Sequence, residues 1–308
     1  MTTQFKEIFS GLQFPEGPIA LDDGGFYVCE TAAGAIRHIR KDGSATVLAK
    51  VGGCPSGIAF GPDGALYGTN GGIADFHERD GKLLPHFAPD NAPPGFIMRI
   101  DPGTGKMERL YTECDGVPLI APNDIVADAH GGFWFTDHGK VRQKDRDHGA
   151  IYYAKFDGSY IRKMFGTMIG PNGIALSPDG KSVYVAETPT ARMWRFDLSA
   201  PGEFARSDAA QLGRKGHLLA GLGGWQWFDS MKVDGEGWAC VATLYNSGIT
   251  AISPDGRTVE HVPLPDPFTT NLCFGGPDMR TAYVTLSTLG KLVAVPWPRR
   301  GLRLNHAR

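Results

Sequence analysis

Six similar short segments recur along the 308-residue chain, and this repeat restricts the fold more than any other feature. The segments start roughly 40 to 67 residues apart, and each follows a turn such as SPDG or GPDG that itself follows an apolar run. They are FYVCET from Phe26, LYGTNG from Leu66, FWFTDH from Phe133, VYVAET from Val183, WACVAT from Trp238 and AYVTLS from Ala282. Short runs of β-branched and aromatic residues between glycine- and proline-rich turns are typical of β-strands, so we expect an all-β fold.

After most of the recurring segments come a third strand, a second turn and a fourth strand, as in AIRHIRKDGSATVLA. Four antiparallel strands repeated six times predict a six-bladed β-propeller of four-stranded blades. The last repeat stops at its third strand, KLVAVPW, whereas QFKEIFSG near the N-terminus resembles an unattached fourth strand. We therefore expect the N-terminal strand to pair into the last blade and close the ring, which leaves no open sheet edge.

An oxygen-bearing residue stands just before the first strand of every repeat. The six are Glu16, Ser56, Asn123, Asn172, Asp229 and Asn271. The first strand of a propeller blade is innermost and lines the central channel, so these side chains are expected to converge at one end of it.

Two carboxylates with several amides form a set of hard oxygen donors that suits Ca²⁺, or another hard divalent ion, better than zinc. Without a cation, two close carboxylates would repel each other and be costly to desolvate. The alternative is that each residue forms a turn, since Asn, Asp and Ser are common turn residues. Glu16 argues for a site because Glu is not a preferred turn former. We therefore expect one divalent ion, with Ca²⁺ favoured and Mn²⁺, Zn²⁺ or Fe²⁺ left as alternatives.

Long insertions are expected at the same end of the channel, because loops joining second to third strands and blade to blade lie there. They comprise residues 71–95, residues 138–149 and the segment from Ala200 to Trp227. Long loops in a compact domain are often functional. The residues expected to line a pocket there are His77, Phe87, His138, His148, Trp225 and Trp227. His138 is the strongest candidate among the histidines because it directly follows a strand.

The bulk composition excludes several function classes. The net charge is −2 and no Lys/Arg block occurs, which argues against a nucleic-acid or anionic-membrane surface. No run of about 18 apolar residues is present, and the start MTTQFKEIFSG does not resemble a secretory signal. We expect one propeller domain over residues 1–308 in a cytoplasmic protein; the oligomeric state stays open.

The patterns PEGP (15–18), PND (122–124), FTD (135–137) and PNG (171–173), with Asp229, resemble the gluconolactonase, regucalcin and luciferin-regenerating-enzyme family. Diisopropyl fluorophosphatase is a more distant relative. The resemblance covers nearly the whole chain and implies a six-bladed propeller with a central divalent ion, usually Ca²⁺, that opens lactones hydrolytically. It implies that Glu16, Asn172 and Asp229 are metal ligands. Asn123 would be a ligand or hold substrate, and Asp229 would also be the candidate base.

These inferences predict a metal-dependent hydrolase that opens a lactone, with Asp229 or His138 activating water and His77, Trp225 and Trp227 helping to bind the substrate. No GxSxG motif occurs, which disfavours a serine hydrolase. Ala121 stands where sugar-lactone members tend to carry Arg, so a more apolar lactone or ester is an alternative to a sugar lactone. Two further alternatives are phosphotriester hydrolysis at the same ion and a non-catalytic ligand- or protein-binding propeller with a structural ion.

Overall fold

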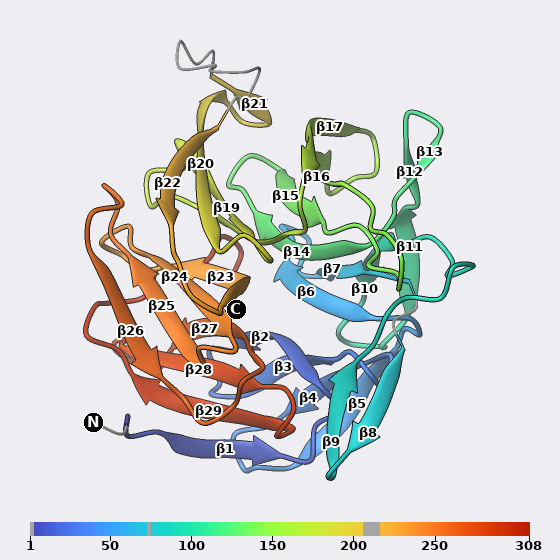
Figure 1. Ribbon diagram of the computed structural model, residues 1–308. Helices are drawn as coiled ribbons and strands as arrows, with labels where there is room; N and C mark the ends of the chain where they lie inside the picture. Colours follow the sequence, from blue (N-terminus) through green and yellow to red (C-terminus); the bar gives the residue numbers. More distant parts are fainter. Residues whose placement is uncertain (1–2, 73–74, 206–215) are drawn as a thin grey trace.

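The computed structural model describes residues 3–72, 75–205 and 216–308, and these contain β-strands but no α-helix. Six antiparallel blades surround a central channel, which confirms the predicted six-bladed β-propeller (Figure 1). None of the described segments is a helix that could cross a membrane.

Each blade has four main strands, ordered here from the channel outward. Blade 1 contains β2 (Pro15–Ala20), β3 (Phe26–Glu30), β4 (Ala35–Ile39) and β5 (Ala45–Lys50). Blade 2 contains β6 (Pro55–Phe60), β7 (Leu66–Asn70), β10 (Phe96–Ile100) and β11 (Met107–Tyr111). Blade 3 contains β14 (Pro122–Ala127), β15 (Gly132–Asp137), β16 (Gly149–Lys155) and β17 (Ile161–Met168).

Blade 4 contains β18 (Pro171–Leu176), β19 (Ser182–Glu187), β20 (Arg192–Ala200) and β22 (His217–Gly221), with β21 (Glu203–Phe204) also paired to β20. Blade 5 contains β23 (Trp227–Val233), β24 (Ala239–Leu244), β25 (Gly248–Ile252) and β26 (Val259–Pro263). Blade 6 contains β27 (Thr269–Gly275), β28 (Thr281–Leu286), β29 (Lys291–Pro296) and the N-terminal strand β1 (Lys6–Ser10).

Strand β1 closes the ring, as predicted. It runs antiparallel to β29, with Lys6 opposite Ala294 and Ser10 opposite Lys291. Lys291 also forms a 2.7 Å ion pair with Glu7. The first and last strands of the chain therefore share one sheet, and the outer edge of β29 is covered (Figure 1).

The core lies between neighbouring blades. All residues of β15 are buried, although an isolated antiparallel sheet would expose alternate side chains. The reason is that each blade is covered on both faces: Phe133 and Phe135 pack toward blade 2, whereas Trp134 packs toward blade 4. The outer strand β5 is mostly exposed, because no further strand covers it.

The inner strands share one irregularity, which the sequence analysis did not predict. Each of the six deviates from regular pairing with its neighbour near its start. The register shifts lie between Glu16 and Ile19, Pro55 and Ile58, Pro122 and Ile125, Pro171 and Ile174, Phe228 and Met231, and Thr269 and Asn271. A β-bulge breaks the alternation of side chains and re-aims the residue it contains.

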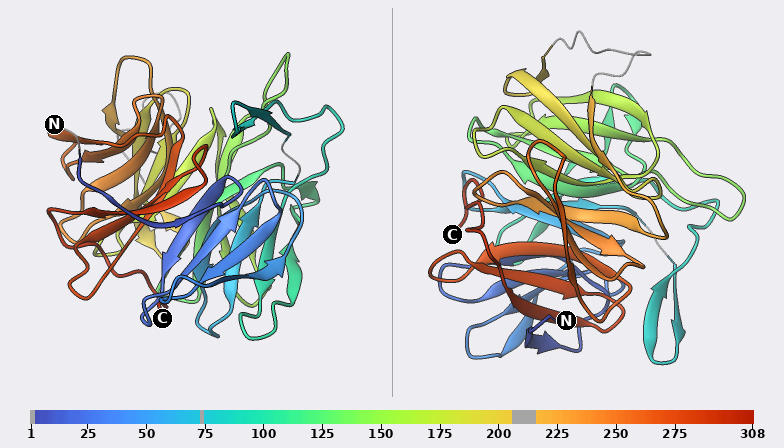
Figure 2. Two further views of the ribbon diagram at one scale, coloured as in Figure 1. Left: turned by 90° about the horizontal axis from the view of Figure 1, so that it is seen from below. Right: turned by 60° about the vertical axis from the view of Figure 1, so that its left-hand side comes forward.

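The C-terminal segment lies across the opposite end of the channel from the starts of the inner strands. Its Asn305 Nδ2 donates to Ala127 O at 2.9 Å at the end of β14, and Arg303 forms a 2.8 Å ion pair with Asp22 of blade 1. Figure 2 shows the C-terminus on the opposite side of the molecule from the hairpin formed by β8 (Phe76–Arg79) and β9 (Lys82–Pro85).

Candidate functional site

The six oxygen-bearing residues lie inside the inner strands rather than just before them. Each is the second or third residue of its strand and lies in or beside the bulge. The predicted place just before the strand was wrong in this detail, because each strand begins one or two residues before its ring residue and the bulge interrupts pairing as a turn would. Five of the six side chains are buried and Asn123 is partly buried. We call the six the ring residues and this end of the channel the ring end.

Neighbouring ring residues contact one another. Asn271 Nδ2 donates to Glu16 Oε2 at 2.8 Å, although the two residues are 255 positions apart in the chain. The Asn172 side chain lowers the pKa of the buried carboxyl group of Asp229 and so opposes the effect of burial. Ser230, next to Asp229, donates from Oγ to Asn172 Oδ1 at 3.3 Å. The structure therefore brings members of four blades together at the ring end.

The two ring carboxyl groups are electrostatically coupled. Burial raises the pKa of Glu16 to about 7, although Asn271 and the Gly17 amide stabilise its charged form. Burial, followed by the charge of Glu16, raises the pKa of Asp229 well above its usual value. A cation between them would stabilise both ionised forms, because an opposite charge at short range offsets desolvation.

A third buried carboxyl group, Asp124, lies beside the ring and has its own cation. Lys232 Nζ is 3.7 Å from Asp124 Oδ2 and donates to Met231 O at 2.9 Å. Asp124 also accepts hydrogen bonds from the Ile125 and Ile174 amides. With Lys232 paired to Asp124, the charge left on the ionised ring is that of Glu16 and Asp229, which one divalent ion would balance.

Asn123 has a side-chain oxygen that is free to bind a ligand. Its Oδ1 is buried and accepts no hydrogen bond from any described residue. A buried amide oxygen without a partner is costly, and a bound cation or substrate would satisfy it. The described residues contain no cluster of three or more His, Cys, Asp or Glu side chains suited to a metal ion. The donor set is instead two carboxylates with amides, which fits a hard cation.

Threonine hydroxyls on the second strands fix the backbone of the ring residues. Thr136 Oγ1 on β15 accepts from the Asp124 amide at 3.2 Å and donates to Asn172 O at 2.5 Å, which links blades 3 and 4. Thr69 on β7 makes the corresponding bond to Asn123 O in blade 3. Both threonines are fully buried. They position neighbouring ring residues relative to each other.

Polar residues at the ends of second strands hold the segments that lead into the inner strands. Asp137, the last residue of the FTD motif, accepts from the Ile120 and Ala121 amides at 2.7 and 2.8 Å. Glu187 accepts from the Ile169 amide at 2.9 Å in the equivalent place of blade 4. This positioning role was not predicted from the sequence. It could have been, because Asp137 and Glu187 each end the second strand of their repeat.

His138 lies between the starts of β14 and β18. Its backbone amide donates to Ala121 O at 2.9 Å, and its Nδ1 lies 2.9 Å from Gly139 O, which makes Nδ1 the donor. Burial, and then the charge of Arg146, lower the pKa of His138 to about 4. The imidazole is therefore neutral near pH 7, with Nε2 able to accept a proton.

The predicted loops 71–95 and 138–149 meet at the ring end. Lys140 Nζ donates to Ala92 O at 3.0 Å, and the Ala88 amide donates to Val141 O at 2.8 Å. Loop 71–95 is not irregular throughout, since it contains the β8–β9 hairpin. His77 is exposed on this hairpin, whereas its neighbour Phe76 contacts Phe14 with ring centroids 5.1 Å apart. Residues 73–74 of this loop, and residues 206–215 of the third expected insertion, lie outside the described residues.

Aromatic side chains form a continuous series at the ring end. Phe14 lies 6.2 Å from Phe268, Phe268 lies 5.7 Å from Tyr245, and Tyr245 lies 5.1 Å from both Trp225 and Trp227, measured between ring centroids. Trp225 is 71% exposed and Trp227 is partly buried, so neither is a core residue. The two tryptophans were expected here from the sequence, whereas Phe14, Tyr245 and Phe268 were not.

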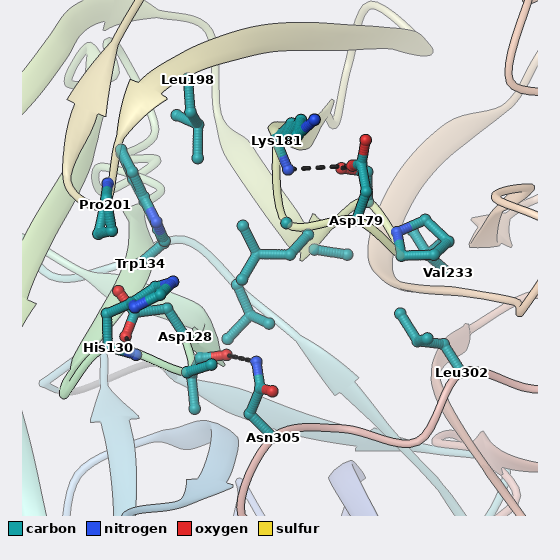
Figure 3. A pocket seen from close by; sticks show the side chains of 18 of the residues that line it. Asp128, His130, Trp134, Asp179, Lys181, Leu198, Pro201, Val233, Leu302 and Asn305 are labelled. Carbon is teal, nitrogen blue, oxygen red and sulfur yellow. Dashed lines mark hydrogen bonds between the residues drawn. The ribbon is translucent and has the colours of Figure 1, made fainter.

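A cavity of about 440 Å³ lies at the opposite end of the channel from the ring, between the ends of β14 and β18 (Figure 3). Its two carboxylates already accept hydrogen bonds from neighbouring residues. Asp128 accepts from the His130 and Gly132 amides, and Asp179 accepts from the Lys181 amide at 3.0 Å. Because no ring residue lines it, this cavity is separate from the candidate site.

Comparison with known proteins identifies the family of the chain. The family model described as SMP-30/Gluconolactonase/LRE-like region matches residues 14–288. A 6-deoxy-6-sulfogluconolactonase of Pseudomonas putida is 30% identical over 217 residues, which cover 67% of this chain and 71% of the relative. A gluconolactonase of Zymomonas mobilis is 26% identical over 289 residues, which cover 89% and 77%.

Solved structures share the fold. A calcium-binding protein, regucalcin, of Agrobacterium tumefaciens superimposes with a TM-score of 0.75 at 20% identity, covering 100% of this chain and 98% of that one. At this identity the likeness concerns the fold alone. The match of the family model over most of the chain is the stronger finding: the chain belongs to the SMP-30/gluconolactonase/LRE-like family.

Proposed function

We propose that the protein hydrolyses a lactone at the ring end of the channel and that a divalent cation, with Ca²⁺ favoured, binds there. Membership of the family and the relatives named as gluconolactonases support the reaction class. The proposal is supported by the Asn271–Glu16 contact, by the influence of Glu16 and Asn172 on the buried carboxyl group of Asp229, and by the unpartnered Oδ1 of Asn123.

In this proposal Glu16, Asn172 and Asp229 hold the cation, and Asn123 is either a further ligand or a substrate contact. When bound, a divalent cation supplies Lewis-acid polarisation of the lactone carbonyl and stabilises negative charge on its oxygen. The all-oxygen donor set favours Ca²⁺ over softer metals, while Mn²⁺, Zn²⁺ and Fe²⁺ remain to be compared.

The protein residues move the protons. Asp229 or His138 accepts a proton from the attacking water as the water oxygen bonds to the carbonyl carbon. The ring carbon–oxygen ester bond then breaks, and the leaving alkoxide takes up the proton to give a hydroxy acid. His138 is neutral and its Nε2 carries no proton, so it can accept one, although its lowered pKa makes it a weaker base than an ordinary histidine. The aromatic residues Trp225, Trp227, Phe14 and Phe268 would offer an apolar face to the substrate. His77, exposed on β8, would contact only a bulky substrate.

Metal analysis followed by a lactone panel tests the proposal. We expect purified protein to contain about one divalent ion per chain, and a chelator to abolish turnover until the ion is restored. Asp229→Ala should lower kcat by roughly 100-fold or more, because it removes a ligand and a candidate base. The control is Asp42→Ala, which removes an exposed turn carboxylate.

Two results would count against the mechanism. Undiminished hydrolysis by Asp229→Ala would remove Asp229 from it, and unchanged turnover in the chelator would remove the cation. A His138→Gln variant separates the two candidate bases: a large loss of kcat with retained metal content assigns proton transfer to His138.

A further inference from the structure

Arg146, in loop 138–149, has an unused hydrogen-bonding edge. Its side chain is partly buried, and both Nε and Nη2 are buried without a partner among the described residues. These two nitrogens form one edge of the guanidinium group and point the same way. A carboxylate, whose two oxygens match that spacing, is the group that such an edge binds in a bidentate manner.

The nearby carboxylates are occupied by other partners. Asp147 receives two hydrogen bonds from Arg142, at 2.9 and 2.8 Å. Glu187 accepts from the Ile169 amide at 2.9 Å and from Thr190 Oγ1 at 2.6 Å. Neither forms an ion pair with Arg146, and burial lowers the pKa of the Arg146 guanidinium.

Arg99 shows what this edge does when a partner is present. Its Nε and Nη2 both donate to Asp63, at 3.0 and 2.7 Å. Arg99 lies on an outer part of blade 2, and its bond is structural. Arg146 offers the same pair of donors at the ring end, without a protein acceptor among the described residues.

Arg146 lies next to the proposed reaction site. A Cβ added to Gly170 would lie 2.5 Å from Arg146 Nη2 and 2.8 Å from His138 Nε2. Both groups therefore lie against the backbone of Gly170, whose positive φ of 62° also favours glycine. Gly170 precedes Asn172 by two residues, a chain distance of at most about 7 Å between Cα atoms. A substrate held near Asn172 and His138 can thus reach the free edge.

We propose that Arg146 binds a carboxylate substituent of the lactone through Nε and Nη2, so that the preferred substrate is an anionic lactone and the product a dicarboxylate. This inference rests on the proposed function and specifies its substrate class. Two buried guanidinium nitrogens without an acceptor are costly, and a substrate carboxylate would supply an acceptor to each of them. Ala121 provides no competing cation on the adjacent segment.

Two matched lactones test the assignment: 5-oxotetrahydrofuran-2-carboxylate and the corresponding carboxamide, which has the same shape without the charge. The wild-type protein should prefer the carboxylate in kcat/KM. Arg146→Gln should raise KM for the carboxylate by roughly 10- to 100-fold and leave the carboxamide nearly unchanged. Arg146→Lys should give an intermediate loss, since it keeps the charge but not the bidentate edge.

Lys144→Gln is the control, because Lys144 is an exposed residue of the same loop and the substitution changes net charge equally. Equal turnover of the two lactones by the wild-type protein, or an equal effect of Arg146→Gln on both, would overturn the proposal.

A binding measurement separates this inference from the proposed function. Isothermal titration with 2-hydroxyglutarate, the ring-opened product, should show binding that Arg146→Gln removes and Lys144→Gln retains. If neither lactone is hydrolysed but this pattern holds, the carboxylate site stands and the hydrolytic proposal fails. If hydrolysis occurs but 2-hydroxyglutarate binds wild type and Arg146→Gln equally, the carboxylate site is wrong.

Discussion

Glu16 shows how a single residue couples the stability of this protein to its ligand. Its carboxyl group is buried beside Asp229 and within the influence of Asp124, and the Asn271 side chain and the Gly17 amide donate to it. In the cation-free protein, the ionised form is therefore disfavoured. The residue that helps to define the site is thus a source of instability when the site is empty.

This residue predicts a pH dependence of stability. The pKa of Glu16 is about 7 in the folded protein, against an ordinary value of 4.5 in an unfolded chain, so the folded state binds more protons between these two values. The free energy of unfolding of cation-free protein should fall as pH rises from about 5 to about 7, by up to about 3 kcal/mol from this group. The raised pKa of Asp229 acts in the same direction.

Urea unfolding in a chelator at several pH values measures the effect. Saturating Ca²⁺ should restore stability at the upper end of the range, because the cation binds the ionised carboxylates. Glu16→Gln should flatten the pH dependence and weaken Ca²⁺ binding together. If the free energy of unfolding changes with pH equally in wild type and Glu16→Gln, Glu16 does not titrate in this range.

At the scale of elements, the inner strands of blades 3 and 4 combine a bulge with a hydroxyl from the second strand of the preceding blade. The bulge at Asn172 frees its carbonyl from regular pairing, and Thr136 of the neighbouring blade donates to that carbonyl. The same hydroxyl accepts from the Asp124 amide. Because one side chain serves two blades, the relative positions of Asn123 and Asn172 depend on it.

Thr136→Val tests this role, since valine keeps the shape but removes the hydroxyl. Two buried backbone groups would lose their partner, so the free energy of unfolding should fall by about 2 kcal/mol. Ca²⁺ affinity should also fall, because the ring residues of blades 3 and 4 are less well positioned. Thr112→Val, at an exposed site, is the control. Unchanged Ca²⁺ affinity, measured by titration, would limit Thr136 to a structural role.

The sequence predicted the blades and the ring closure, because each depends on a pattern repeated along the chain. The Asn271–Glu16 contact agrees with the predicted convergence of the ring residues. The bulges were not predictable, since a Pro-Asn pair before an apolar run is equally consistent with a turn. The contact between Phe14 and Phe76 depends on how loop 71–95 folds back, which no repeat encodes. Arg146 was overlooked in RQKDRD because its charge resembles that of its solvated neighbours.

At the scale of the whole molecule, the two chain ends stabilise opposite parts of the ring. The C-terminal segment bridges several blades at the end away from the ring residues. The Nε atom of buried Arg299 is 2.6 Å from Asp234 Oδ2, and its guanidinium group lies over the ring of Trp238. Strand β1 instead closes the ring laterally by pairing with β29. Every blade packs on two neighbours. Loss of the C-terminal contacts or of the β1–β29 pairing should therefore lower the stability of the whole ring.

Deletion of residues 1–10 tests the lateral closure. It removes β1, exposes the edge of β29 and uncovers Leu292, against which Ile8 and Phe9 help to complete the core. We expect the melting temperature to fall by roughly 10 °C or more, with a tendency to aggregate through the free strand edge. Deletion of residues 1–4 is the matched control, because it leaves β1 intact. Since the ring residues meet across blade 6 through Asn271 and Glu16, the larger deletion should also weaken Ca²⁺ binding. If the protein lacking residues 1–10 has the same melting temperature as the protein lacking residues 1–4, the C-terminal segment and blade packing alone hold the ring closed.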